Sequence, residues 1–304
     1  MRALIAGATG FVGTRLARVL HASDVDVRSL VRDRGRAGHL ERDGVELHEA
    51  DVLDAAALRG AGRDVDMAYY LVHSMGRGGN RDFAARERGA ARNFARMARE
   101  EGVGRVVYLG GLGGDDASSR HLRSRHETAE ILRTEGPPLT YFRAAMVVGR
   151  ESESYRMLRS LVERLPAMIA PSWLGTETQP IGVDDVIAYL EQAPRVEASA
   201  GREVQIGGPD VVSYGDMLDR MAVALGIRPR PKLRVPVITP QLSALWIGLV
   251  TPVDVGVARP LIEGLRTPTA VTDPSGAALF DVDPIPLTET LRRAIAEEGE
   301  AVAA

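Results

Sequence analysis

The chain has 304 residues, 45% of them hydrophobic and 26% charged, which is enough to bury a large core in one or two domains. The net charge of −3 shows no basic excess of the kind that binds nucleic acid, so we expect no nucleic-acid partner. The absence of cysteine excludes disulfides, zinc–thiolate sites and cysteine nucleophiles, and Lys232 is the single lysine.

The first half of the chain alternates short apolar runs with amphipathic segments. Apolar residues at helical spacing predict helices at 11–21 and 81–101, and a short helix from Asp54. The apolar runs predict strands at 2–6, 26–31, 45–49, 67–72, 105–109 and 139–144. Alternation of this kind is typical of a parallel sheet covered on both faces. The predicted fold class is therefore α/β, a Rossmann doubly wound parallel sheet.

The second half of the chain is less regular. We expect helices at 152–164 and 214–225, a strand at 202–206, and in 179–186 a strand that runs into a helix capped by Asp184. The predicted Rossmann domain covers residues 1–150 and is completed by 178–208. Residues 151–177 and 209–304 are expected to form a smaller, mostly helical substrate lobe.

Residues 235–258 are strongly apolar. A membrane span needs about 20 continuous apolar residues, whereas Pro236, Pro240 and Pro252 break this segment into pieces. We therefore expect no transmembrane segment here, but helices that line the core or a pocket, with a membrane-facing patch as the alternative. The N-terminus leads directly into a strand and glycines rather than a signal peptide, so we expect a cytoplasmic protein.

A glycine-rich loop joins the first predicted strand to the first predicted helix. Its glycines suit a tight turn, close approach to a pyrophosphate, and close packing of the helix on the sheet. The helix N-terminus that follows favours negative charge. The sequence thus predicts a dinucleotide site. Its expected cofactor-binding residues in this loop are Gly7, Thr9, Gly10, Phe11, Val12 and Gly13.

The residues after the second strand indicate which dinucleotide binds. NAD-binding proteins of this fold carry an acid there, but this chain has Arg32, and a guanidinium suits a 2′-phosphate. The predicted cofactor is therefore NADP, although Asp33 could reach a ribose hydroxyl and the run could be a solvated charge cluster. Asp51 and Val52, after the third strand, are expected to contact the adenine.

The residues that end the fourth strand face the edge of the sheet where this fold binds ligands. We expect Leu71, Val72 and His73 to contact the cofactor there. His73 is placed beside the nicotinamide or the substrate, and packing within the loop is the alternative for it.

Seven segments carry a resemblance to a known family. They resemble the glycine motif and strand endings of atypical and extended short-chain dehydrogenases/reductases, in particular the NmrA-like NAD(P)H-binding subgroup, with Ala6 in place of the usual threonine. The segments are residues 6–13 (AGATGFVG), 27–33 (VRSLVRD), 69–75 (YYLVHSM), 108–112 (YLGGL), 121–125 (HLRSR), 179–181 (QPI) and 207–210 (GGPD). The resemblance covers most of the chain and implies the fold and the cofactor, but no particular substrate.

The chain departs from this family at the catalytic residues. Family members reduce carbonyls with a serine and a Tyr-x-x-x-Lys pair, and no tyrosine here precedes a lysine at that spacing. Where that pair would lie, the chain has His121 and Arg125, and glycines stand where the serine would be. We expect neutral His121 to donate the proton, with Arg125 as its electrostatic partner and His73 as a relay through water. A surface position for His121 is the alternative.

These observations favour an NADP(H)-dependent oxidoreductase that acts on a small, largely apolar carbonyl, quinone or enone. The alternatives are a non-catalytic NADP(H) sensor and an epimerase or dehydratase that retains its nicotinamide. An apolar substrate fits the large side chains of the predicted lobe, which are Met157, Leu161, Trp173, Leu245 and Trp246. The histidines do not cluster, so we predict no metal site, and the chain is a candidate for homodimer formation.

Overall fold

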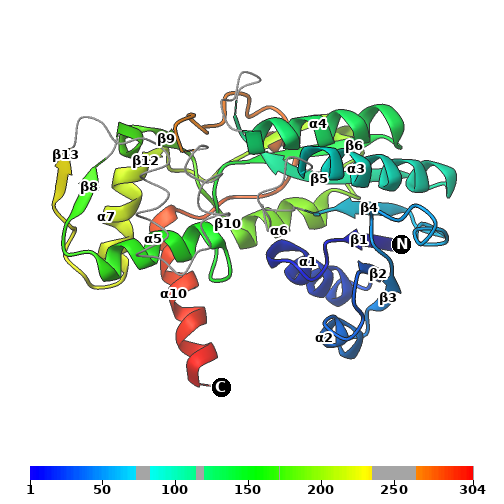
Figure 1. Ribbon diagram of the computed structural model, residues 1–304, viewed down its shortest axis with the longest axis horizontal. Coiled ribbons are helices and arrows are strands. Elements are labelled where there is room, and N and C mark those ends of the chain that lie inside the picture. Colours follow the sequence, from blue (N-terminus) through cyan, green and yellow to red (C-terminus); the bar gives the residue numbers. More distant parts are fainter. Residues whose placement is uncertain (73–82, 114–119, 171, 235–264, 304) are drawn as a thin grey trace.

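A parallel sheet of seven strands forms the centre of the protein (Figure 1). The computed structural model describes residues 1–72, 83–113, 120–170, 172–234 and 265–303. The strand order is β11-β6-β5-β4-β1-β2-β3, and the predicted α/β doubly wound class is confirmed. The strands are β1 (Arg2–Ala6), β2 (Asp26–Val31), β3 (Glu46–Glu49), β4 (Met67–Tyr70), β5 (Arg105–Gly111), β6 (Leu139–Ala144) and β11 (Glu203–Ile206).

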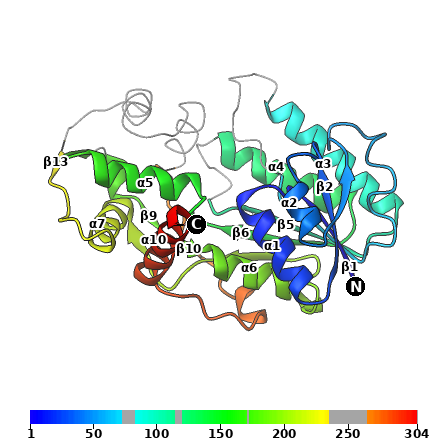
Figure 2. The same ribbon diagram turned by 90° about the horizontal axis from the view of Figure 1, so that it is seen from below.

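Helices cover both faces of this sheet (Figures 1 and 2). Both faces need cover because successive side chains of a strand point to opposite faces, as Tyr69 and Tyr70 of β4 do. Tyr69 packs in the core beneath α1 and α6 and donates to the carbonyl of Leu190 at 3.0 Å. Tyr70 packs on the other face against Phe94 of α3, with ring centroids 4.9 Å apart. The helices are α1 (Phe11–Ala22), α2 (Gly38–Arg42), α3 (Phe83–Glu100), α4 (Arg120–Glu135) and α6 (Val183–Gln192).

The short helix predicted from Asp54 is wrong, because residues 55–64 form consecutive turns. Side chains from distant segments bind the backbone groups that a helix would pair internally. Arg28 donates to the carbonyls of Gly60, Ala61 and Arg63 at 2.9–3.2 Å. Glu101 accepts from the amides of Gly60 and Gly62 at 2.5 and 2.6 Å. The turns are thus stabilised by tertiary contacts that the local pattern does not contain.

The predicted cap of α6 is also wrong. The N-cap residue is Gly182, and Asp184 lies inside the first turn together with Asp185. Acidic side chains in a first turn complement the helix dipole without capping it. The buried Asp185 also accepts from the amide of Ile285 at 3.3 Å, which ties the helix start to the C-terminal segment.

The remaining elements form a second group around their own apolar core, drawn to the left in Figure 1. Helices α5 (Glu153–Arg164), α7 (Tyr214–Ala224) and α10 (Leu287–Ala303) supply most of it. Ser152 caps α5 and Ser213 forms a capping box with Asp216 on α7. The short elements are β7 (Val147–Val148), β8 (Met168–Ala170), η1 (Ser172–Gly175), β9 (Glu177–Thr178), β10 (Ile181–Gly182), η2 (Glu197–Ser199), β12 (Val212–Ser213), β13 (Lys232–Arg234) and η3 (Ala277–Leu279).

The apolar segment 235–258 lies wholly within residues 235–264, which are outside the described residues. Among the helices that the structure describes, none is both long enough and apolar enough to cross a membrane.

Phe280 joins the C-terminal part of the chain to the central sheet. Its ring is buried, 5.3 Å from the Phe142 ring of β6 and 5.5 Å from the Tyr189 ring of α6. Leu279 and Val282 pack against the same core. The chain beyond α7 therefore contributes to the stability of the sheet as well as to the second group.

The substitution Phe280→Ala should lower the free energy of unfolding by about 3–5 kcal/mol, because it removes a buried ring and leaves a cavity between two others. Urea unfolding followed by circular dichroism measures this difference. Phe280→Leu refills most of the space and should cost clearly less. Equal stability of wild type and Phe280→Ala would contradict the packing role.

Candidate cofactor and substrate site

The glycine loop leaves β1 at the carboxyl edge of the sheet with almost no free space around it. Gly7 has φ +91°, and a Cβ there would lie 2.6 Å from the carbonyl oxygen of Leu71. A Cβ on Gly13 would lie 2.2 Å from the carbonyl oxygen of Gly7. Thr14 fixes the turn by donating to the Ala8 carbonyl at 2.8 Å. These positions require glycine because the neighbouring atoms are backbone atoms that cannot move independently.

The N-terminus of α1 is suited to an anion. Gly10 is the N-cap, no side chain of the described residues caps this helix, and its first turn contains no acid. Free amides and the helix dipole favour a phosphate at such a position. Gly10 and Thr9 are exposed, while Phe11 and Val12 are partly buried at the start of the helix. The predicted loop residues therefore surround one helix end.

Arg15 connects this helix to distant parts of the chain. Its guanidinium lies 5.0 Å from the centre of the Phe11 ring and pairs with Glu151 and with Glu297 of α10, each at 2.7 Å. A Cβ on Gly149 would lie 2.7 Å from the other side of Phe11. The first turn of α1 is thus fixed by contacts from the second group of elements, which the sequence pattern did not reveal.

Arg32 is the residue predicted to bind a 2′-phosphate. It follows β2, which is paired with β1 in parallel, so its backbone lies beside the glycine loop. Arg32 is exposed, and within the described ranges no ion pair or hydrogen bond engages its guanidinium. Arg34, by contrast, pairs with Glu41. Asp33 accepts from the Arg36 amide at 3.2 Å, which fixes the turn.

The residues predicted to contact the adenine lie at the same edge, two and three residues beyond β3. Asp51 accepts from the amide of Leu53 at 2.9 Å, and Val52 is buried. Asn93 of α3, which sequence reasoning missed, donates to the carbonyls of Val52 and Leu53, both at 3.1 Å. This loop is therefore fixed from both sides before any ligand binds.

The end of β4 forms the opposite wall of the glycine loop. The Leu71 amide donates to the Ala6 carbonyl at 2.8 Å, and the backbone of Leu71 and Val72 lies against Gly7. Leu71 is buried and Val72 is partly buried. His73 lies outside the described residues, so its predicted contact with the nicotinamide or substrate stays a prediction.

The end of β5 explains why the family serine is missing. A Cβ on Gly110 would lie 2.7 Å from the Tyr141 ring, and one on Gly111 would lie 2.8 Å from Cδ2 of Leu122. The space of the missing side chain is therefore already filled. Arg125 of α4 lies close by, with its Cδ 3.7 Å from that Gly111 position. His121 belongs to the same helix, but its side chain is outside the described part of the structure.

Arg143, the penultimate residue of β6, was not predicted as a site residue. It pairs with Glu203 of β11 at 2.6 Å and donates to the carbonyls of Gly111 (3.3 Å) and Gly113. These bonds hold the chain where it leaves β5, at the edge where the cofactor is expected. An arginine inside an apolar strand run was the signal that could have identified it.

The tyrosines of the neighbouring core are poor candidates for a proton donor. Burial raises the pKa of Tyr108 well above its usual value and raises the pKa of Tyr141 to about 12. The two rings stack with centroids 5.2 Å apart, and the Tyr108 hydroxyl donates to the Arg125 carbonyl at 3.3 Å. Both side chains therefore support the sheet and the start of α4.

Lys232 does not replace the family lysine. It lies in β13 and pairs with Asp219 of α7 at 2.5 Å. Figure 1 shows β13 at the end of the molecule opposite to β2 and β3. The single side-chain amine of the chain is thus remote from the cofactor edge.

An apolar pocket opens in the second group of elements, with a free volume of about 20 Å³. Met146 in its wall lies two residues beyond β6, so the pocket adjoins the carboxyl edge of the sheet. Its other lining residues are Ser154, Met157, Leu158, Leu161, Trp173, Tyr214, Leu218 and Leu265. Met157, Leu161 and Trp173 were among the apolar residues predicted for the substrate site, whereas Leu245 and Trp246 lie outside the described residues.

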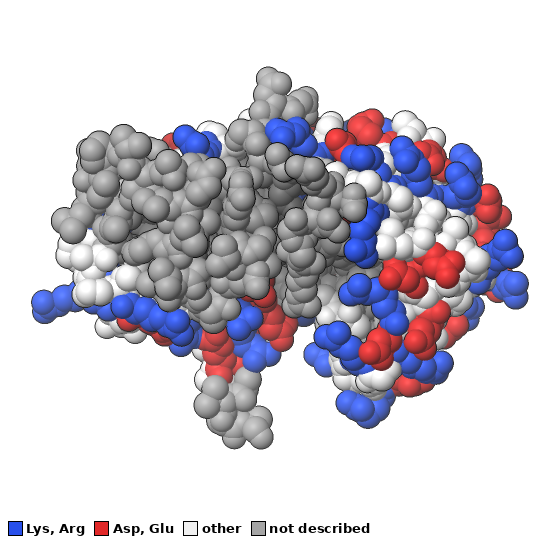
Figure 3. Space-filling model, viewed as in Figure 1, with Lys and Arg blue, Asp and Glu red and all other residues white. Residues whose placement is uncertain are grey.

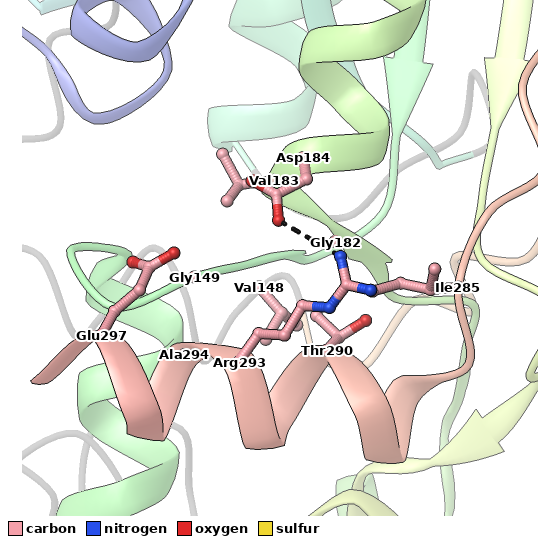
Figure 4. Close-up of a pocket in the computed structure, with 10 residues that line it drawn as sticks. All are labelled: Val148, Gly149, Gly182, Val183, Asp184, Ile285, Thr290, Arg293, Ala294 and Glu297. Carbon is pink, nitrogen blue, oxygen red and sulfur yellow. Dashed lines mark ion pairs between the residues drawn. The ribbon is translucent and has the colours of Figure 1, made fainter. Parts of the chain in front are cut away.

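A second pocket, shown in Figure 4, lies between α10 and the N-terminus of α6. Its wall is mixed: Asp184, Arg293 and Glu297 contribute charged groups and Thr290 a hydroxyl, beside apolar side chains such as Val148 and Ile285. Arg293 lies 3.9 Å from Asp184. Carboxylates of both helices make this pocket a poor site for an anionic or apolar ligand.

The fold and the glycine loop define a dinucleotide-binding protein of the Rossmann type. The chain belongs to the NAD(P)H-binding family, whose family model matches residues 7–162, just over half of the chain. This membership confirms the resemblance deduced from the sequence motifs, and NAD(P)H is the cofactor of the family. The described residues contain no group of three or more His, Asp or Glu placed to hold a metal.

One characterised relative and two solved structures place the chain among similar proteins. The sterol demethylase protein B of Methylococcus capsulatus is 27% identical over 178 residues, covering 57% of this chain and 53%, about half, of that relative. The Citrobacter sp. triphenylmethane reductase complexed with NADP(H) has a TM-score of 0.76 at 17% identity, covering 96% and 99% of the two chains. The NADPH-dependent quinone oxidoreductase QOR2 of Escherichia coli, complexed with NADPH, has a TM-score of 0.71 at 18% identity, covering 96% and 98%.

Proposed function

We propose that the protein is an NADP(H)-dependent oxidoreductase that acts on a small, largely apolar carbonyl, quinone or enone. The observation that carries this proposal is an apolar pocket that begins at Met146, beside the same sheet edge that holds the glycine loop. Ligands of open α/β sheets bind at this edge, and an apolar wall next to a nicotinamide suits an uncharged substrate. When bound, NADPH would supply the hydride.

The similar solved structures support this proposal. One is a triphenylmethane reductase and the other an NADPH-dependent quinone oxidoreductase, and both were crystallised with an NADP-type cofactor. Triphenylmethane dyes and quinones are conjugated molecules with large apolar surfaces, and the pocket lined by Met157, Leu161 and Trp173 offers apolar surface to such molecules.

For the chemical step we propose His121 as the proton donor, Arg125 as its electrostatic partner and His73 as a relay through water. Of these three residues, only Arg125 has a side chain that the structure describes. It lies beside Gly111 at the end of β5. A nearby cation disfavours the charged form of an imidazole, so His121 would donate from its neutral form.

Turnover is the experiment that tests the function. Purified protein should oxidise NADPH in the presence of at least one member of a panel of aromatic ketones, quinones and enones, measured by loss of absorbance. NADPH binding without turnover on any of them would favour the sensor function. If the protein as purified releases a stoichiometric amount of nicotinamide dinucleotide cofactor, this would favour an epimerase or dehydratase.

The preference for NADP over NAD depends on Arg32 in this proposal. A charge-assisted, bidentate contact to a phosphate is worth about 1.5–3 kcal/mol, so Arg32→Ala should weaken NADPH binding by roughly 10–150-fold and leave NADH binding unchanged. Fluorescence titration with both cofactors measures this. Arg34→Ala is the matched control, because Arg34 pairs with Glu41. Equal affinity of the wild type for NADPH and NADH would refute the proposal.

The cytoplasmic location, the homodimer and the division of the chain into a Rossmann domain and a substrate lobe stay predictions.

In the view of Figure 3, basic and acidic side chains are interspersed over the surface of the central sheet and its helices. The described residues in this view therefore form no continuous stripe of one charge.

A further inference from the structure

Arg15 joins the cofactor-binding end of α1 to the C-terminal helix α10. Its two terminal nitrogens donate to carboxylates that lie 136 and 282 residues further along the chain, those of Glu151 and Glu297, each at 2.7 Å. Glu151 precedes α5, and Glu297 lies in the second half of α10. Because both carboxylates come from outside the central sheet and its helices, this guanidinium connects the two groups of elements.

The same guanidinium fixes the first residue of α1. It lies 5.0 Å from the centre of the Phe11 ring, a cation–π contact, and the edge of that ring packs against Gly149. The first hydrogen bond of the helix runs from the Thr14 amide to the Gly10 carbonyl at 2.9 Å, so the amides of residues 11–13 have no partner within the helix. Phe11 therefore carries one of the amides that are available to a pyrophosphate.

The start of α10 is anchored by contacts that do not involve α1. The Leu287 amide donates to Asp210 at 2.8 Å, and Leu291 packs in the core of the second group. Glu297 lies beyond these contacts, on the Gly149 side of the pocket in Figure 4. The ion pair with α1 thus acts on the later part of α10, where its loss leaves the start of the helix in place.

We propose that Arg15 couples cofactor binding to the attachment of α10. With both glutamates bound, the guanidinium stays over the Phe11 ring and keeps the first amides of α1 in the orientation that binds the pyrophosphate. Because coupling between two sites is reciprocal, a cofactor on these amides strengthens the attachment of α10 by the same factor. Arg15 is thus a positioning residue. The inference goes beyond the proposed function, since it concerns binding of the family's cofactor and no reaction.

The first experiment measures NADPH affinity by fluorescence titration in Arg15→Met, which keeps an unbranched side chain and removes the charge. The lost contacts are one cation–π contact and two partly exposed ion pairs, so Kd should rise about 3–10-fold. Arg15→Lys, which keeps the charge but cannot present the same planar fork, should recover part of this loss. Circular dichroism shows that each variant is folded.

The matched control is Arg18→Met. Arg18 lies one turn further along α1 and pairs with Asp43 at the end of α2 instead of α10. It should keep the wild-type Kd. An unchanged Kd in Arg15→Met would overturn the proposal, and so would an equal rise in Arg18→Met or a wild type that does not bind NADPH.

A double-mutant cycle tests whether Glu297 acts through Arg15. Glu297→Gln should weaken NADPH binding about 2–5-fold in the wild-type background and leave it unchanged in the Arg15→Met background. Glu289→Gln is the control on α10, because Glu289 pairs with Arg292 and Arg293 of its own helix, and it should have no effect. The same loss from Glu297→Gln in both backgrounds would show that the two residues act independently, against the coupling.

Hydrogen exchange followed by mass spectrometry measures the reciprocal effect. Saturating NADPH should slow the exchange of the backbone amides of residues 295–299 by about 3–10-fold in wild type. In Arg15→Met this slowing should be lost, although saturating NADPH still protects α1. Exchange in α10 that does not respond to NADPH in wild type would overturn the coupling even if Arg15→Met binds NADPH weakly. None of these measurements requires turnover, so the reductase function could fail while the coupling stands, and the reverse.

Discussion

Gly13→Val should abolish NADPH binding while the chain still folds. A Cβ on Gly13 would lie 2.2 Å from the carbonyl oxygen of Gly7 and 2.8 Å from its carbonyl carbon. Both are backbone atoms of the loop that carries the phosphate site, so the loop has to move as a whole. Such a shift would displace the amides of the α1 N-terminus from the pyrophosphate.

The measurement is a titration of NADPH fluorescence, with circular dichroism to show that the variant is folded. Gly299→Ala is the matched control, because nothing lies within 4 Å of a Cβ on this glycine of α10. It should keep wild-type affinity and stabilise the helix slightly. A folded Gly13→Val variant with wild-type affinity would show that the loop does not bind the pyrophosphate.

The second large effect is expected at His121. If the protein is a reductase, His121→Ala should lower kcat by about 10²–10⁴-fold, the usual contribution of a general acid, while NADPH affinity is unchanged. The argument is positional, because His121 and Arg125 are four residues apart on α4 and the Arg125 side chain lies beside Gly111 at the end of β5.

Single-turnover reduction of an active ketone or quinone separates this loss from changes in product release. His126→Ala is the control on the same helix, since an offset of five residues turns it away from His121. Full activity of His121→Ala would remove this residue from the mechanism. A loss of the same size in His126→Ala would indicate a general disturbance of α4 rather than proton donation.

The central sheet could be predicted from the sequence because its information is local. Buried parallel strands appear as continuous apolar runs, and Tyr69 and Tyr70 belong to such a run although they pack on opposite faces. The errors arose where distant groups determine the backbone. Arg28 and Glu101 hold residues 55–64 in turns, and no window around Asp54 contains either of them.

The candidate site divides in the same way. The glycine loop could be recognised because its constraints come from a few consecutive residues and the ends of adjacent strands. The contacts of Asn93 and Arg143 could not, because they join segments separated by 30 to 60 residues.

Lys232, which pairs with Asp219, carries the only side-chain amine of the protein. An acylating reagent has only this side chain and the N-terminal amine to modify, and the N-terminal amine can be blocked first. A dye coupled afterwards to Lys232 would sit on β13, remote from β2 and β3 (Figure 1). Coupling the same amine to a sensor surface would immobilise every molecule in one orientation, with its nucleotide edge accessible to flowing ligand.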